Sequence, residues 1–179
     1  MDAVRKLYEK YGVDGYYKRH HNDYQNPHAE CVRELLVNNG HRLDYSNVLD
    51  LCCGNGEVSS VLVSLGYPDM TGCDPFTFRE YRQATGKPCF KYSFDDIIRG
   101  RLTGSYSSII CSFGMHLCPE DRLFPLVTNL FALSASIVII TPHKRPALEE
   151  LGLATLDFED FALTPKGKKV RLKAYRPGW

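Results

Sequence analysis

Short, continuous apolar runs alternate with amphipathic stretches along most of the chain. Several of the runs are rich in Ile and Val, which is typical of strands buried on both faces of a parallel sheet. The stretches between them place apolar residues three or four positions apart, the spacing of one helix face. The pattern therefore predicts parallel strands at residues 48–50, 69–73, 87–92, 106–112 and 136–141.

Helices are expected between these strands, at residues 57–65, 77–81, 96–99, 120–133 and 147–151. The helix over 120–133 has the clearest apolar stripe, formed by Leu123, Leu126, Val127, Leu130 and Phe131. Residues 155–163 and 169–175, separated by a Gly-containing turn, predict an antiparallel hairpin. The sequence therefore predicts an α/β fold: a doubly wound, seven-stranded, mostly parallel sheet with a C-terminal antiparallel hairpin and helices on both faces.

The N-terminal segment, residues 1–45, differs from the core expected over residues 46–179. It is rich in tyrosine and histidine before a helix that starts near Asn26 and contains Val32, Leu35 and Leu36. One interpretation is a helical lid or substrate segment; the other is a helix pair packed at the domain edge. At 179 residues the two segments fit one compact domain.

Composition narrows the class of protein. Hydrophobic residues at 44% and charged residues at 24% are globular values, and a net charge of +1 argues against bulk polyanion binding. The seven cysteines show no Cys-x-x-Cys or zinc-finger spacing, so we expect reduced thiols, no metal, and a location in the cytoplasm or nucleus. The chain shows neither a signal peptide nor an apolar run near the ~20 residues of a membrane span.

Candidate chemistry concentrates where the first strand ends. Asp50 closes that strand, and Gly54 and Gly56 form a turn that opens into a helix at Glu57. Such a turn lets a ligand approach bare backbone beside the positive end of a helix dipole. Since a carboxylate repels a pyrophosphate, Asp50 suits a cationic ammonium group. Asp74 ends the second strand, where an acid accepts hydrogen bonds from ribose hydroxyls; its alternative is a helix cap.

The run Asp50-Leu51-Cys52-Cys53-Gly54-Asn55-Gly56 resembles the first motif of class I S-adenosylmethionine-dependent methyltransferases, an acid followed by Gly-x-Gly-x-Gly. Cys52 stands where the first Gly is usual, and a residue with a Cβ avoids positive φ. The resemblance spans about residues 46–176. It implies S-adenosyl-L-methionine as cofactor, with S-adenosyl-L-homocysteine as product, and a cofactor site made by Asp50, Cys52, Gly54, Gly56, Asp74, Pro75, Phe94, Asp95, Ser112 and Phe113, with Asp96 as the alternative to Asp95.

The resemblance also implies direct transfer of a methyl group to an oxygen or nitrogen of a small molecule or an RNA. Candidate catalytic residues are His116, Tyr24 and His28. His116 would act as a general base near neutral pH; its alternative is packing against Leu117. Tyr16, Tyr24, Asn26 and His28 would close the site.

Two other functions stay open: a catalytically silent cofactor-binding partner or sensor subunit, and a dinucleotide oxidoreductase, against which Asp50 and the missing Gly at position 52 count. No motif for base methylation of DNA is present, because Ser112-Phe113-Gly114-Met115 replaces an Asn/Asp-Pro-Pro-aromatic run. We expect a monomer, with a partner subunit as the alternative. His143, Lys144, Arg145 and the basic stretch 166–176 are either contacts for an anionic substrate or solvated surface.

Overall fold

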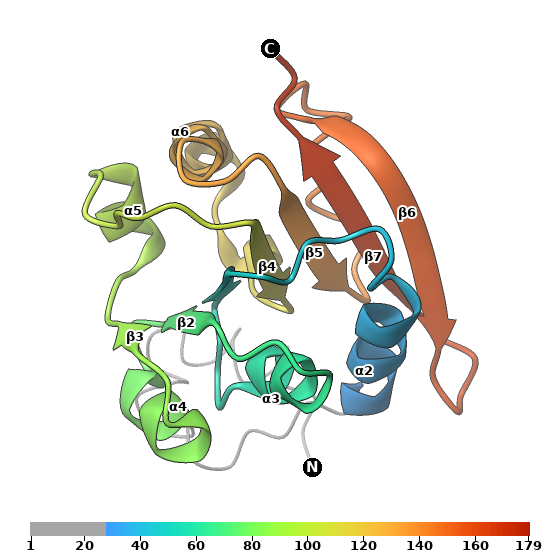
Figure 1. Cartoon of the computed structure of the whole chain (residues 1–179). Helices are drawn as coiled ribbons and strands as arrows, with labels where there is room; N and C mark the ends of the chain where they lie inside the picture. Colours follow the sequence, from blue (N-terminus) through green and yellow to red (C-terminus); the bar gives the residue numbers. More distant parts are fainter. Residues whose placement is uncertain (1–27) are drawn as a thin grey trace, which may run out of the picture.

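A seven-stranded sheet forms the centre of the computed structural model, which describes residues 28–179 (Figure 1). The strand order is β3-β2-β1-β4-β5-β7-β6. Strands β1 to β5 are parallel, and β7 runs antiparallel to both β5 and β6. The strands are β1 Val48–Leu51, β2 Met70–Cys73, β3 Cys89–Phe90, β4 Ser108–Ser112, β5 Ile137–Thr141, β6 Thr155–Leu163 and β7 Lys169–Arg176.

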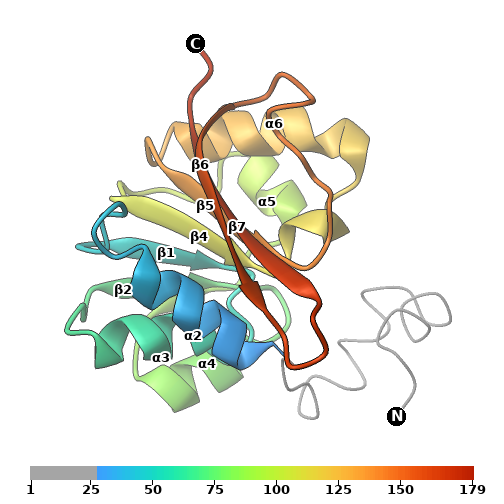
Figure 2. The same cartoon turned by 90° about the vertical axis from the view of Figure 1, so that its right-hand side faces the viewer.

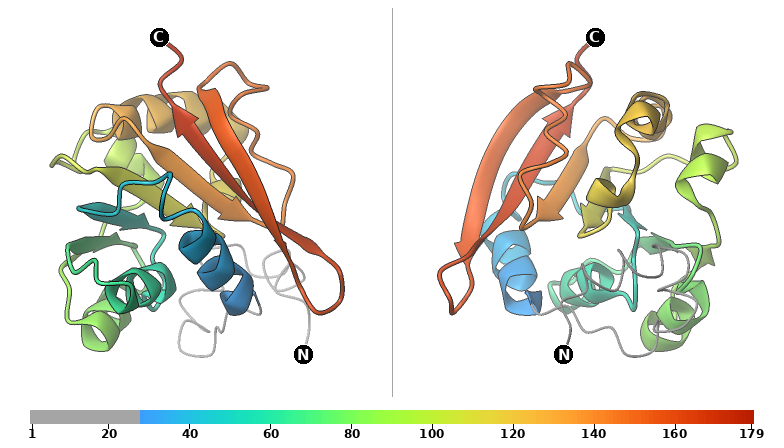
Figure 3. Two further views of the ribbon diagram at one scale, coloured as in Figure 1. Left: turned by 45° about the vertical axis from the view of Figure 1, so that its right-hand side comes forward. Right: turned by 180° about the vertical axis from the view of Figure 1, so that it is seen from behind.

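Helices cover both faces of the sheet. The helices are α2 Ala29–Asn38, α3 Glu57–Ser64, α4 Phe78–Thr85, α5 Phe94–Ile98 and α6 Glu120–Phe131, with a 3-10 turn η1 at Met115–Leu117. Figures 1 and 3 show α2, α3 and α4 on one side of the sheet and α5 and α6 on the other. The predicted doubly wound α/β fold is confirmed, including the C-terminal antiparallel hairpin.

The side-chain alternation of the strands builds two cores. Ile110 of β4 and Ile140 of β5 pack with α2 and α3, whereas Ile109 and Ile139 pack with α6. Because both faces are covered, β4 and β5 read in sequence as continuous apolar runs. The predicted apolar stripe of α6 is buried at Leu123, Leu126, Val127 and Leu130.

Several elements differ from the sequence prediction. Strand β1 continues one residue beyond Asp50, and β3 contains only Cys89 and Phe90. The helix predicted at 147–151 is wrong: it is a hydrogen-bonded turn in which Leu151 N–H donates to Ala147 O at 3.2 Å. Gly152, with φ of 67°, turns the chain into the left-handed region, so the helix cannot continue past one turn.

Helix α2 belongs to the same core as the sheet. It buries Cys31, Val32, Leu35 and Leu36, and Asn39 donates a side-chain hydrogen bond of 2.8 Å to Asp160 of β6. Figure 2 shows α2 lying along the β6–β7 hairpin. Tyr16, Tyr24 and Asn26 lie outside the described residues, so the lid stays a prediction. Within residues 28–179, no helix has the length and apolarity that crossing a bilayer requires.

Candidate active site

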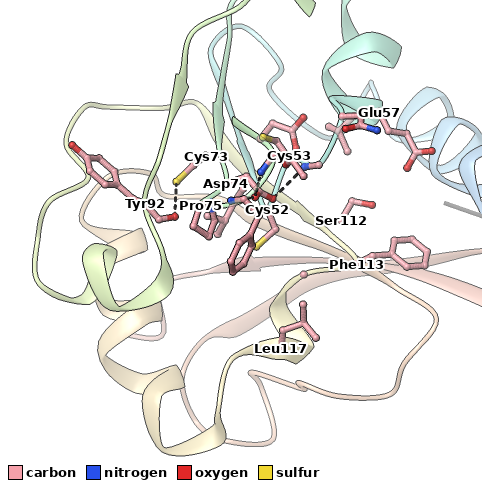
Figure 4. A pocket seen from close by; sticks show the side chains of 18 of the residues that line it. Cys52, Cys53, Glu57, Cys73, Asp74, Pro75, Tyr92, Ser112, Phe113 and Leu117 are labelled. Atoms are coloured by element: carbon pink, nitrogen blue, oxygen red, sulfur yellow. Dashed lines mark hydrogen bonds between the residues drawn. The ribbon is translucent and has the colours of Figure 1, made fainter. Parts of the chain in front are cut away.

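A cavity of about 550 Å³ opens at the carboxyl ends of β1, β2 and β4 (Figure 4). The strand order reverses between β1 and β4, and the crevice at such a point is where doubly wound sheets bind ligands. The lining contains most of the predicted cofactor residues: Asp50, Cys52, Gly54, Asp74, Pro75, Phe94, Ser112 and Phe113.

Asp50 lies in the cavity wall with only 1% of its surface exposed. Its Oδ2 accepts two hydrogen bonds from Ser59 on α3, from the hydroxyl at 2.7 Å and from the backbone N–H at 3.2 Å. Burial raises the pKa of Asp50 to about 7, although the Ser59 hydrogen bonds act in the opposite direction. A cation placed beside this carboxyl group would restore its charge, because an opposite charge favours the ionised form.

The Asp50 side chain is supported by a second hydroxyl. The Tyr81 hydroxyl on α4 lies 2.7 Å from the Ser59 Oγ, and its ring is fully buried. The ring fits because β2 carries Gly72 beneath it: a Cβ there would lie 2.7 Å from the Tyr81 ring. Since the Ser59 hydroxyl hydrogen is given to Asp50, the Tyr81 hydroxyl donates to Ser59, and the chain of hydrogen bonds points toward the carboxylate.

The turn after β1 uses left-handed backbone at three residues. Cys52, Gly54 and Gly56 have φ of 57°, 54° and 86°. Cys52 therefore adopts the conformation expected of the usual glycine, at a cost of about 1–2 kcal/mol for a residue with a Cβ. Gly54 has open space beside it, but a Cβ on Gly56 would lie 2.4 Å from Thr85 Cγ2. Gly56 does not line the cavity; it allows close packing of α3 on α4.

Asp74 lies just beyond β2, on the same wall as Asp50. Its Oδ1 accepts the backbone N–H groups of Phe76 at 2.8 Å and Thr77 at 2.9 Å, and its Oδ2 accepts that of Gly54 at 3.4 Å. Asp74 thus orders the turn that leads into α4, although the N-cap residue of this helix is Thr77 and not Asp74, and Asp74 also faces the cavity.

The far wall follows β3 and is formed by Tyr92, Ser93, Phe94 and Ile97. Neither acid predicted for this wall reaches the cavity. Asp95 pairs with Arg122 of α6, and the Asp96 side chain accepts the Ser93 N–H at 3.0 Å in a capping box. Both acids lie in the first turn of α5, so they complement its dipole. Phe94 is the predicted residue that the structure places at this wall.

The end of β4 closes the cavity opposite Asp50. Ser112 Oγ is buried and, among residues 28–179, has no hydrogen-bond partner. Phe113 has φ of 59°, in the left-handed region that costs a bulky residue energy. A Cβ on Gly114 would lie 2.4 Å from the Cys52 Cβ, so Gly114 makes room for the side chain at the usual glycine position.

Two of the three candidate catalytic residues, His116 and His28, lie in the described part of the chain. His116 does not line the main cavity; it lines a smaller one of about 260 Å³ and packs on His143, with ring centroids 4.3 Å apart. Burial, and then the charge of His143, lower the pKa of His116 to about 4. His28 precedes α2 and stacks on Phe113 at 5.5 Å. Burial, Lys168 and His143 lower the pKa of His28. Tyr24 lies outside the described residues.

Sequence reasoning missed Ser59, Tyr81 and Thr77. Ser59 stands among apolar residues on the buried face of α3, and Thr77 lines the cavity with a buried, unpartnered Oγ1 in the described part of the chain. A polar residue within an apolar stripe is a signal that marks Ser59. Gly72 inside β2 marks a close approach, here that of Tyr81.

Comparison with known proteins identifies a relative of the chain and solved structures with the same fold, although no family model matches the chain. The protein C17A5.05c of Schizosaccharomyces pombe, described as uncharacterized, is 30% identical over 77% of this chain and 74% of its own length.

Solved structures with the same fold include magnesium protoporphyrin IX methyltransferase from Synechocystis PCC 6803 with bound S-adenosylhomocysteine, with a TM-score of 0.66 at 18% identity over 97% of each chain. N-methyltransferase NodS from Bradyrhizobium japonicum WM9, also bound to S-adenosylhomocysteine, gives 0.65 at 13% identity over 98% of this chain and 99% of its own. The chain therefore belongs to the same family as C17A5.05c, and its fold is that of the class I S-adenosylmethionine-dependent methyltransferases.

Proposed function

We propose that this protein binds S-adenosylmethionine and transfers its methyl group to an oxygen or nitrogen of a small anionic or polar molecule. The observation that carries the proposal is the pairing of Asp50 and Asp74, buried on one wall of the cavity at the point where the sheet order reverses. The solved structures with bound S-adenosylmethionine or its product support the cofactor.

The residues present fit this cofactor. Buried Asp50 favours a cation, as the ammonium of the methionine end provides. Ser112 Oγ and Thr77 Oγ1, both in the cavity wall, are buried and have no partner in the described part of the chain, which favours a ligand with polar groups. The open space beside Gly54 allows a ligand to approach the backbone of the turn.

Each part of the cofactor is assigned to one part of the wall. Asp50 and the backbone from Cys52 to Gly54 would hold the methionine end. Asp74 and Pro75 would hold the ribose, and Phe94 would cover the adenine. Asp95 is not retained for the adenine, because its carboxylate pairs with Arg122. Ser112 and Phe113 would border the methyl group.

The reaction requires the protein mainly to position the acceptor and to remove the acceptor's proton. When bound, S-adenosylmethionine supplies a methyl group already activated by a sulfonium. The protein must align the acceptor atom with that methyl and take the acceptor's proton. We assign proton removal to His28, which stacks on the cavity residue Phe113 and whose lowered pKa favours the neutral imidazole that a general base requires. Tyr24 is proposed to assist it.

The surface charges favour a small acceptor over an RNA. Of the basic residues predicted to guide phosphate near the C-terminus, Lys173 pairs with Glu149 and Arg176 with Asp157, and Lys169 lies over the Phe161 ring at 4.1 Å. The carboxylates of Glu149 and Asp157 offset two of these positive charges and so reduce the field that an extended polyanion requires, whereas the neutral Phe161 ring leaves the charge of Lys169 unchanged.

Calorimetry with S-adenosylhomocysteine, followed by transfer of a tritiated methyl group to fractionated cell extract, tests the proposal. Binding and transfer are expected. Tight binding without transfer to any fraction would favour the silent partner or sensor. Binding of NADH in place of S-adenosylhomocysteine would instead support an oxidoreductase.

Asp74→Asn is expected to weaken S-adenosylhomocysteine binding by about 1–3 kcal/mol, the penalty for ribose hydroxyls left without an acceptor. The asparagine Oδ1 still accepts the N–H groups of Phe76 and Thr77, so the melting temperature should change little. Asp74→Ala removes both functions and should lower stability as well. Unchanged affinity in the asparagine variant, measured by calorimetry, would show that the ribose lies elsewhere.

His28→Gln is expected to lower the rate of methyl transfer by about 10²-fold or more, the usual contribution of a general base. His116→Gln should lower it by less than about tenfold, because His116 lines the smaller cavity and packs on His143, and its pKa of about 4 makes it a weak base. Both variants should bind S-adenosylhomocysteine like the wild type. The reverse order of rates would return the catalytic role to His116.

A further inference from the structure

His28 stacks on Phe113, a residue of the cavity wall, and the charges of basic residues from two other parts of the fold act on His28. His28 stacks on Phe113 from the start of α2, and His143 follows the end of β5. Lys168 lies in the turn between β6 and β7, the two strands against which α2 packs (Figure 2). These residues are separated by more than twenty positions in sequence, so only the fold brings them together.

The strand alternation places Lys168 on the same face as His28. Val170 and Leu172 of β7 are buried in the core that α2 covers. Lys168 is two residues before Val170. The Thr164 N–H donates to the Lys168 carbonyl at 2.9 Å, and the Lys168 N–H donates to the Thr164 hydroxyl at 3.0 Å, so the two chains stay side by side beyond the Ala162–Val170 pair. Lys169 takes the opposite face, where it lies over Phe161. The alternation thus puts Lys168 on the face of the hairpin that α2 covers and Lys169 on the other.

The charges that act on His28 from the described residues are both positive. Lys168 and His143 each lower the pKa of His28, and His143 in turn packs on His116. Two acids, Glu120 and Glu150, line the smaller cavity together with His116. Lys168 and His143 are exposed, so both can meet a ligand that enters from solvent.

We propose that Lys168 and His143 form a subsite for an anionic oxygen group, carboxylate or phosphate, carried by the methyl acceptor. The assignment rests on the proposed function, since the group would lie beside the methyl end of the cofactor. The subsite extends the proposed function by specifying that the methyl acceptor carries a negative charge. An anion at this place would also stabilise the imidazolium that forms when His28 takes the acceptor's proton.

Titration with inorganic phosphate, and separately with acetate, tests the subsite by NMR of the histidine imidazoles. Phosphate or acetate is expected to shift the resonances of His28 and His143 and to leave that of His41, at the other end of α2, unchanged. The anion that binds more tightly indicates whether the acceptor carries a phosphate or a carboxylate. Lys168→Gln should weaken the response about two- to fivefold, the usual size of an exposed charge contact.

Lys169→Gln is the matched control, because it removes the same charge one residue away on the opposite face. Equal weakening in the two lysine variants, or the absence of shifts at His28 and His143, would overturn the subsite. The titration is made on the free protein and on the protein saturated with S-adenosylhomocysteine. A protein that responds to phosphate but does not bind S-adenosylhomocysteine keeps the anion site and rejects the methyltransferase proposal.

Discussion

Asp50→Asn is expected to weaken binding of S-adenosylhomocysteine by about 2–5 kcal/mol, the cost of leaving one partner of a buried charge pair alone. The amide oxygen still accepts the hydrogen bonds from Ser59, so the fold should persist. Burial raises the pKa of Asp50 in the folded protein, so ionising this carboxyl group costs more free energy there than in the unfolded chain. The free energy of unfolding therefore decreases as pH rises from about 4 to above 7. The asparagine variant lacks this cost, and at pH 8 it should melt at the same temperature as the wild type or higher.

The pH dependence of binding separates this role from a structural one. The wild type should bind S-adenosylhomocysteine less tightly as pH falls through about 7, because protonation of Asp50 removes the charge that the ammonium meets. This dependence should disappear in Asp50→Asn. Tyr67→Phe, which changes a tyrosine in the α2 core and not in the cavity, is the control and should bind like the wild type. Calorimetry that finds equal affinities for wild type and Asp50→Asn would remove Asp50 from the cofactor site.

Gly114→Ala is expected to destabilise the protein by about 1–3 kcal/mol or more, the range for added atoms in a packed interior. The new Cβ would lie 2.4 Å from the Cys52 Cβ and 2.6 Å from its Sγ. Cys52 cannot easily retreat, because its left-handed backbone fixes where its side chain points. Urea unfolding of the variant measures the loss.

The double variant Cys52→Gly with Gly114→Ala supplies the control. Removing the Cys52 side chain relieves both the clash and the left-handed strain, so the double variant should recover most of the lost stability. Cys52→Gly alone should be close to neutral, since the strain it removes offsets the contacts it loses. Additive effects of the two changes would mean that the clash is relieved elsewhere.

The fold was predictable because each element carries its own periodic signal. The continuous runs at Ile109–Cys111 and Ile137–Ile140 describe strands covered on both faces, and α6 shows its buried stripe directly. The segment 147–151 was predicted as a helix because of its apolar residues. A short apolar segment also fits a single turn, and the left-handed backbone of Gly152 ends the segment after one turn.

The site was predictable where it follows strand ends and unpredictable where it depends on long-range pairing. The position of Asp50 and Asp74 in the cavity wall was predictable because parallel strands end at one edge of the sheet. The position of Asp95 outside the wall was not, because its carboxylate pairs with Arg122, which lies on another helix. Ser59 and Tyr81 come together only through the packing of α3 on α4. The sequence around each residue gives no signal for this contact.

The contact between Cys52 and Gly114 has a consequence for how such chains are compared. The Cys52 side chain occupies the space that a Cβ at position 114 would need, so these two positions, which follow adjacent strands, share one volume at the tip of the sheet. The size of the residue tolerated at one position therefore depends on the residue at the other. Residues 52 and 114 are therefore best treated as one joint position in redesign or in the classification of relatives.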